Sequence, residues 1–125
     1  VYVAAGKQGA DYDAVLAGWS QDYPDPYDFI DVLLNGNNIQ GENNNNLAYL
    51  NDKQLNEQLA AANKLTGDAR YNRYGNLDVS ITTNIAPWVS TDNRNQRDFI
   101  GKRVGGYLFQ PANGFADMVT FYLNQ

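Results

Sequence analysis

The sequence contains no cysteine and no histidine, and these two absences exclude several kinds of functional site. The chain has no thiol nucleophile, no Cys/His zinc site, no Ser-His-Asp triad and no disulfide. Only carboxylates remain for acid–base chemistry, so we expect no enzyme, no catalytic residue and no cofactor. The absence of cysteine does not identify the compartment, because it is compatible with exported bacterial proteins as well as with cytosolic ones.

Basic residues and long apolar runs are also scarce. The chain has 9 Lys and Arg against 14 Asp and Glu, a net charge of −5, which argues against nucleic-acid binding. No apolar run approaches the roughly 20 residues of a membrane helix. No charged-then-apolar start is visible, so we expect any targeting segment to lie outside this sequence. With 125 residues and 43% hydrophobic residues, the chain can bury a core.

Asparagine and tyrosine are abundant, with 17 and 9 copies. Both side chains hydrogen-bond neutral polar ligands without adding charge. The simpler interpretation is that Asn occupies turns and Tyr lies half-buried. Residues 35–46 form a low-complexity, Asn-rich segment, which we expect on the surface or over a cleft.

The hydrophobic pattern predicts short strands and helices. Residues 12–19 predict a buried strand, because they are short and mostly apolar. Asp25 and Pro26 predict a helix start, with Asp25 as N-cap. The apolar face of that helix is expected to comprise Phe29, Val32 and Leu33.

A second helix is predicted to begin near residues 51–52, because Leu55, Leu59, Ala62 and Leu65 keep helical spacing. Residues 69–85 are ambiguous: their apolar residues fit a helix, but their Val, Ile and Thr content favours a strand. Residues 107–109 and 118–123 are strand candidates.

Four aspartates recur every third position: Asp22, Asp25, Asp28 and Asp31. A calcium loop needs oxygens at alternate positions and a sharp glycine turn, which this segment lacks. We therefore predict no metal site, and interpret these residues as a helix cap, a first-turn charge and solvent-facing acids.

Four motifs follow one another along residues 12–125. Residues 17–29 read AGWSQDYPDPYDF, residues 45–51 contain Asn-Asn, Tyr and Asn, residues 86–88 read APW, and residues 104–107 read VGGY. In this order they resemble motifs of extracellular solute-binding protein family 5. Its members are the substrate-binding proteins of bacterial ABC transporters for peptide and oligopeptide transport.

The resemblance implies an α/β fold, namely a lobe fragment of a type II periplasmic-binding-protein-like clamp with short strands and about three helices. Family members are several times longer, so the chain would be their C-terminal portion. Residues 1–95 would belong to the C-terminal lobe, and residues 96–125 would be a return segment that packs on the other lobe. The crossing is expected near Arg94 to Arg97. The resemblance also implies that residues 69–85 are a helix.

The implied function is that of a solute-binding receptor component of an ABC importer, with a peptide as the first candidate ligand. Receptors of this kind close two lobes around the ligand by a hinge motion. By its place in the motif, Asp22 would neutralise the α-ammonium of a peptide, and Trp19 and Tyr23 would line the site. The implied partners are a small solute and the membrane permease of the importer. The implied location is extracytoplasmic: periplasmic, or as a lipoprotein anchored at the outer face of the cell membrane.

Alternatives stay open for the function and for two of the site residues. A carbohydrate-binding receptor of the same fold would stack sugars on Trp19 or Tyr23, and a non-transport surface interaction module would use the Asn-rich surface. Asp22 is alternatively a loop acid, and Trp19 a core residue. The isolated fragment is also expected to form a homodimer through apolar side chains that have lost their cover, namely Tyr107, Phe109, Phe115, Met118, Phe121 and Leu123.

Overall fold

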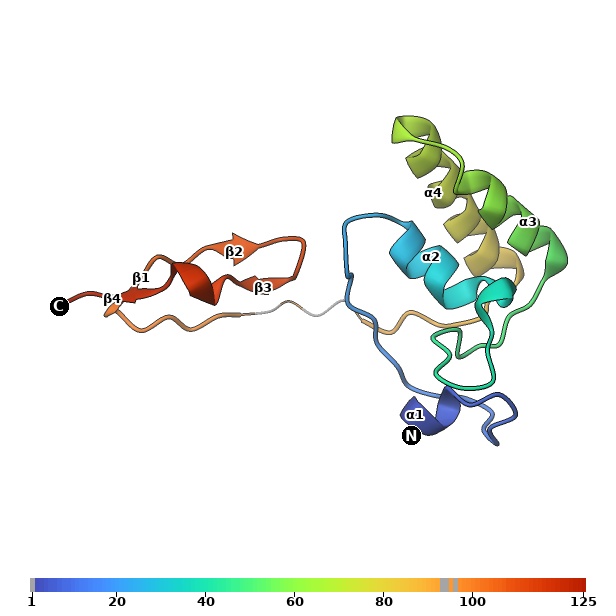
Figure 1. Ribbon diagram of the computed structural model, residues 1–125, viewed down its shortest axis with the longest axis horizontal. Helices are drawn as coiled ribbons and strands as arrows, with labels where there is room; N and C mark the ends of the chain where they lie inside the picture. The colour runs from blue at the N-terminus through green and yellow to red at the C-terminus, as the bar shows by residue number, and fades with distance from the viewer. Residues whose placement is uncertain (1, 93–94, 96) are drawn as a thin grey trace. The chain divides into compact units, whose positions relative to one another are not determined.

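The computed structural model describes residues 2–92, 95 and 97–125, and the chain divides into two compact units (Figure 1). The first unit comprises Val1–Trp19 and Asp25–Val89, and the second comprises Ser20–Pro24 and Ser90–Gln125. The predicted boundary at residue 95 and the crossing near Arg94 to Arg97 stay predictions, and Arg94 lies outside the described residues.

The described part of the first unit is helical. After the short α1 (Tyr2–Ala5) come α2 (Tyr27–Leu34), the 3-10 turn η1 (Gly36–Asn38), α3 (Lys53–Ala62) and α4 (Gly67–Asn84). The Asp52 carboxylate caps α3 by accepting a hydrogen bond from the Leu55 amide at 2.7 Å, as expected for an aspartate at this position. No helix in the described ranges is long and apolar enough to span a bilayer.

One hydrophobic core joins α2, α3 and α4. Tyr27, Leu33, Leu50 and Trp88 are partly buried and pack against it. The buried members of this core are Ile30, Leu34, Leu55, Leu59, Ala62, Tyr74, Leu77 and Ile81. The predicted spacing of the second helix is therefore confirmed through Ala62.

The ambiguous segment 69–85 is helical, as the family resemblance implied, because it lies in α4 except for its last residue. Tyr74, Leu77 and Ile81 lie three to four residues apart and are all buried on one side. Val79, whose branched side chain favours a strand, is 66% exposed. Burial of one helical face therefore overrides the local β preference.

The predicted apolar face of α2 is only partly right, because Leu33 packs against the core whereas its buried members on this helix are residues that were not predicted. Ile30 and Leu34 are buried, whereas Phe29 is 38% exposed. The interpretation of Asp31 as a solvent-facing acid is wrong, because Asp31 is 2% exposed. Asp28 lies in the first turn of α2, as predicted, but it is buried, at 1% exposed. Both carboxylates accept hydrogen bonds from inside the first unit, which is what allows a charged group to be buried.

The predicted strand at residues 12–19 is also wrong. The described residues pair only as β1 with β4 and β2 with β3, so the segment has no ladder partner. Leu16 within it is 86% exposed. The segment is anchored near its ends instead: the Tyr12 hydroxyl donates to the Leu47 carbonyl at 2.7 Å, and the Trp19 indole N–H donates to Asp28 Oδ2 at 3.3 Å.

The described residues of the second unit form four two-residue strands. β1 (Val104–Gly105) pairs antiparallel with β4 (Tyr122–Leu123), and β2 (Phe109–Gln110) pairs antiparallel with β3 (Phe115–Ala116). The 3-10 turn η2 (Met118–Thr120) precedes β4, so the predicted strand at 118–123 is confirmed only at its end. The mixture of helices and short strands is compatible with an α/β fragment, whereas the type II fold stays a prediction.

Candidate functional site

Trp19 ends the segment that leads toward α2, and its position is set by a buried acid. Its indole N–H donates to Asp28 Oδ2 at 3.3 Å, and its side chain is only partly covered. One side of Trp19 is thus engaged with the first turn of α2 while part of the residue stays accessible. Trp19 is therefore neither a fully buried core residue nor a freely exposed surface residue.

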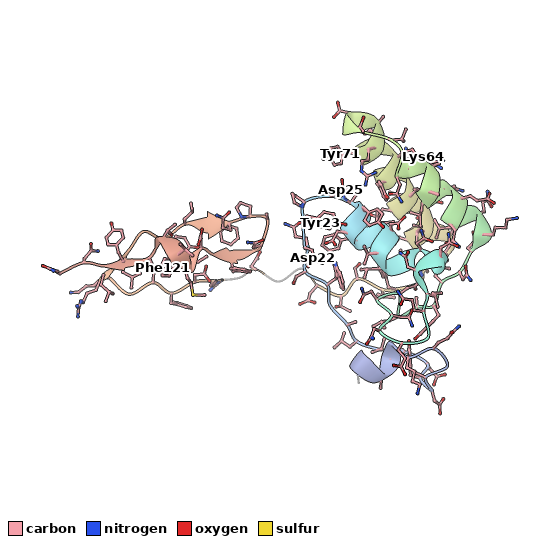
Figure 2. All side chains as sticks on the ribbon, in the orientation of Figure 1. Asp22, Tyr23, Asp25, Lys64, Tyr71 and Phe121 are labelled. Carbon is pink, nitrogen blue, oxygen red and sulfur yellow. The ribbon has the colours of Figure 1, made fainter. Side chains whose placement is uncertain are left out.

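Asp22 and Tyr23 follow three and four residues later and are exposed (Figure 2). Both belong to the second unit, in which Gln21 Nε2 donates to the Pro111 and Ala112 carbonyls at 3.1 and 2.6 Å. Trp19 belongs to the first unit, so the grouping of the three predicted site residues stays a prediction. In the described ranges, no three His, Cys, Asp or Glu residues come together in a way that could hold a metal ion.

A polar network that the sequence did not predict connects α2 with the C-cap of α3 and with α4. Its members Asp31, Asn35 and Tyr74 are buried, whereas Asn63 is exposed. Asp31 Oδ1 accepts a hydrogen bond from Asn63 Nδ2 at 3.0 Å, and both its oxygens accept from Asn35 Nδ2 at 3.3 Å. The Tyr74 hydroxyl donates to Asn63 Oδ1. Burial raises the pKa of Tyr74, and the nearby Asp31 carboxylate raises it further. This network is structural in character, because its polar groups satisfy one another.

The start of α2 is tied to α4 by an ion pair. Arg70 donates from Nη2 to Asp25 Oδ1 at 2.8 Å and from Nε to Asp25 Oδ2 at 3.0 Å. The hydrogen bond from Arg70 lowers the pKa of Asp25, and the bond from the Tyr27 amide at 2.8 Å lowers it further. The prediction of Asp25 as N-cap and Pro26 as the first helical residue is wrong by one position, because α2 begins at Tyr27 and Pro26 is its N-cap. Asp25 instead precedes the cap and accepts a hydrogen bond from the Tyr27 amide.

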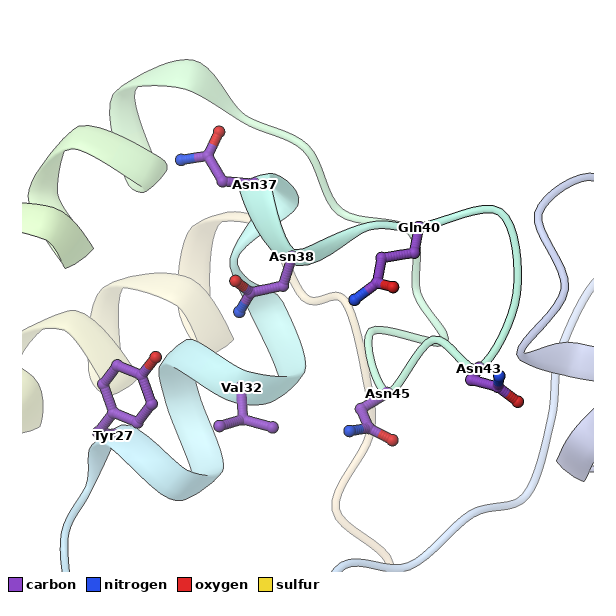
Figure 3. Close-up of a pocket in the computed structure, with 7 residues that line it drawn as sticks. All are labelled: Tyr27, Val32, Asn37, Asn38, Gln40, Asn43 and Asn45. Carbon is purple, nitrogen blue, oxygen red and sulfur yellow. The ribbon is translucent and has the colours of Figure 1, made fainter.

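The Asn-rich loop forms a pocket of about 330 Å³ beside α2 (Figure 3). Asn38, Gln40 and Asn45 extend from the loop toward the side of α2 that carries Tyr27 and Val32. Burial raises the pKa of Tyr27, as does the adjacent Asp31 carboxylate. The full lining consists of Tyr27, Val32, Asn37, Asn38, Gln40, Asn43 and Asn45. The sequence predicted that this segment lies on the surface or over a cleft, but not which of its amides line the pocket.

The chain is similar to heme-binding protein A of Haemophilus influenzae. The two sequences are 32% identical over 114 residues, which covers 88% of this chain and 19% of that protein. The chain thus spans about a fifth of the length of this relative. No family model matches the sequence. No solved structure matches it either.

Proposed function

We propose that this chain is a segment of an extracytoplasmic solute-binding protein that delivers a peptide to the permease of an ABC importer. The observation that carries the proposal is the similarity to heme-binding protein A, which extends over 88% of the chain. The ordered motifs at residues 17–29, 45–51, 86–88 and 104–107 agree with it. The segment has no catalytic role in this proposal.

Asp22 is the proposed partner of the peptide ammonium group. An amine taken out of water needs a carboxylate partner, since an unpaired buried charge is strongly destabilised. Asp22 and Tyr23 are consecutive exposed residues on the segment that leads into α2 (Figure 2). Trp19 precedes Asp22 by three residues in the sequence. Asp22 is followed directly by Tyr23 in the sequence, so this segment offers a carboxylate and an aromatic side chain to an amino-terminal group with a neighbouring apolar side chain.

Heme is the second candidate ligand, because the name of the Haemophilus influenzae relative states that it binds heme. The present chain lacks the two commonest axial ligands, histidine and cysteine, and contains a single methionine, Met118. Tyrosine is the remaining ligand type that the segment supplies in number. The peptide is placed first because the motif at residues 17–29 resembles that of the peptide-binding family.

The experiment compares ligands in the receptor that contains this segment. Isothermal titration of a tripeptide with a free amino terminus and of its N-acetylated form tests the ammonium contact, and heme absorbance tests the second candidate. We expect Asp22→Asn to weaken binding of the free peptide about tenfold or more, the scale of losing a charge-assisted contact. Asp78→Asn removes an exposed acid on α4 and serves as the matched control.

Equal binding of free and acetylated peptides by the wild type would contradict the role of Asp22. A receptor that binds heme and no peptide, with Asp22→Asn unchanged, would replace the peptide proposal by the heme one. A protein that binds neither, nor any other small solute, would contradict the receptor function altogether.

A further inference from the structure

The pocket between the Asn-rich loop and α2 has no charged side chain in its lining. Amide groups and the Tyr27 hydroxyl supply its polar atoms, and Val32 with the Tyr27 ring supplies an apolar wall (Figure 3). The three loop amides that extend toward this wall belong to Asn38, Gln40 and Asn45. The chemistry of the pocket is therefore neutral, with several hydrogen-bonding groups beside one apolar surface.

Two buried asparagines hold the loop in shape. Asn44 accepts from the Gln40 amide and donates to the Gln40 carbonyl, both at 2.7 Å, and also donates to the Gly6 carbonyl at 2.8 Å. Asn46 makes the same pair of bonds with Leu50, accepting from its amide at 3.2 Å and donating to its carbonyl at 2.9 Å. The backbone at Gln40 and on both sides of Asn45 is therefore fixed, as in a preorganised binding site.

The loop amides that face the pocket have hydrogen-bonding capacity to spare. Within the described part of the chain, the side-chain amides of Gln40 and Asn45 donate to no other group and accept from none. Asn38 Nδ2 donates to the Asp31 carbonyl at 2.9 Å, which orients its amide and leaves its oxygen as an acceptor. Each free amide carries both donors and an acceptor.

We infer that this pocket binds a neutral saccharide of one or two sugar rings. A sugar hydroxyl donates and accepts at once, which matches side-chain amides, and the C–H face of a sugar ring packs on an aromatic or aliphatic wall. A charged solute would leave its charge unpaired in this lining. The volume of about 330 Å³ lies at the small end of ligand pockets. Asp22 is not among the lining residues, and the inference does not depend on the receptor proposal.

The test uses the isotopically labelled 125-residue chain and backbone amide shifts. The probes are glucose, galactose, mannose, maltose and lactose, with glucuronate and dialanine as charged counterparts. We expect at least one neutral sugar to shift the amides of residues 37–46 in a saturable way, and the charged probes to shift them less. Gln40→Ala and Asn45→Ala should each weaken that binding about three- to tenfold, the range for one lost hydrogen bond. Gln54→Ala removes an exposed amide on α3 and should change nothing.

Three results would overturn the inference. These are the absence of any saturable shift with every neutral sugar, an unchanged affinity in both pocket variants, or tighter binding of dialanine than of the sugars. A circular dichroism spectrum of each variant that matches the wild type shows that its fold is retained. Failure of the Asp22 experiment would leave this outcome unaffected, so the two proposals are tested independently.

Discussion

Arg70 on α4 and Asp25 before α2 form a two-point ion pair, with Nη2 to Oδ1 at 2.8 Å and Nε to Oδ2 at 3.0 Å. The same guanidinium donates from Nη1 to the Ala62 carbonyl at 3.2 Å. It also lies 5.0 Å from the centre of the Tyr74 ring, within the range of a cation–π interaction. One side chain thus joins the start of α2 and the end of α3 to α4.

The stability of the first unit should depend on pH through Asp25. Its pKa is lowered from 3.8, first by the hydrogen bond from Arg70. Because the pKa of Asp25 is lower in the folded state than in the unfolded state, the ion pair stabilises the folded state at any pH above the unfolded-state pKa. This stabilisation is lost as the pH falls through the folded-state pKa. Urea unfolding from pH 7 to pH 2 should show Asp25→Asn about 1.5 kcal/mol less stable at neutral pH. The difference should shrink below about pH 4.

A second substitution at Asp25 separates the charge from the hydrogen bond to the Tyr27 amide. Asparagine can still accept from the Tyr27 amide, whereas Asp25→Ala removes that bond too. Asp25→Ala should therefore lose about 1 kcal/mol more than Asp25→Asn at every pH. If the difference between wild type and Asp25→Asn stays constant down to pH 2, the ion pair is not its source.

The Tyr74 hydroxyl should contribute to the free energy of unfolding. Tyr74 is fully buried and donates to Asn63, which in turn donates to Asp31. Tyr74→Phe keeps the ring in the core but removes this donor, and should cost about 1 kcal/mol in a chemical denaturation experiment. Tyr71→Phe on the same helix, where the side chain is 53% exposed, should leave the midpoint unchanged. Equal effects of the two substitutions would show that the network adds nothing.

Gly106 should be essential for the short sheet β1–β4. It has a φ of +77°, and a Cβ at this position would meet the Thr120 carbonyl. Gly106→Ala should therefore broaden or shift the amide signals of residues 104–105 and 122–123. Trp19 and Trp88 both belong to the first unit. In Gly106→Ala, tryptophan fluorescence should therefore give the same unfolding midpoint as in the wild type. Gly114→Ala has a similar φ of +72° but open space around it, and should perturb the spectrum less.

The isolated chain should self-associate through its second unit. Large apolar side chains are exposed there, and covering them is favourable by about 25 cal/mol per Å². We expect size-exclusion chromatography with light scattering to show a dimeric fraction that increases with protein concentration. Val119→Glu, at a residue 93% exposed, should favour the monomer, whereas Leu16→Glu in the first unit, 86% exposed, should not. A 13.9 kDa species at every concentration would contradict this prediction. The exposed side chains concerned are Tyr107, Leu108, Phe109, Phe115, Met118, Val119, Tyr122 and Leu123.

Part of the candidate site was predictable because its signals are local. The Asn-rich composition of residues 35–46 predicts a loop on the surface or over a cleft, and a pocket lies there. Which asparagines support the loop and which face the pocket was not predictable. Asn44 and Asn45 are neighbours of the same type, yet Asn44 is buried by its bonds to Gly6 and Gln40 while Asn45 is exposed.

The sequence by itself determined the helix α3, because its leucine spacing and the Asp52 cap act within a few residues. Only the tertiary structure decided that residues 67–84 form a helix, since their local preferences conflict and burial of Tyr74, Leu77 and Ile81 selects one. It also decided that Asp28 and Asp31 are buried, because their partners Trp19 and Asn63 lie 9 and 32 residues away. Segment 12–19 has strand-like residues but no ladder, because a strand exists only where another chain segment satisfies its backbone.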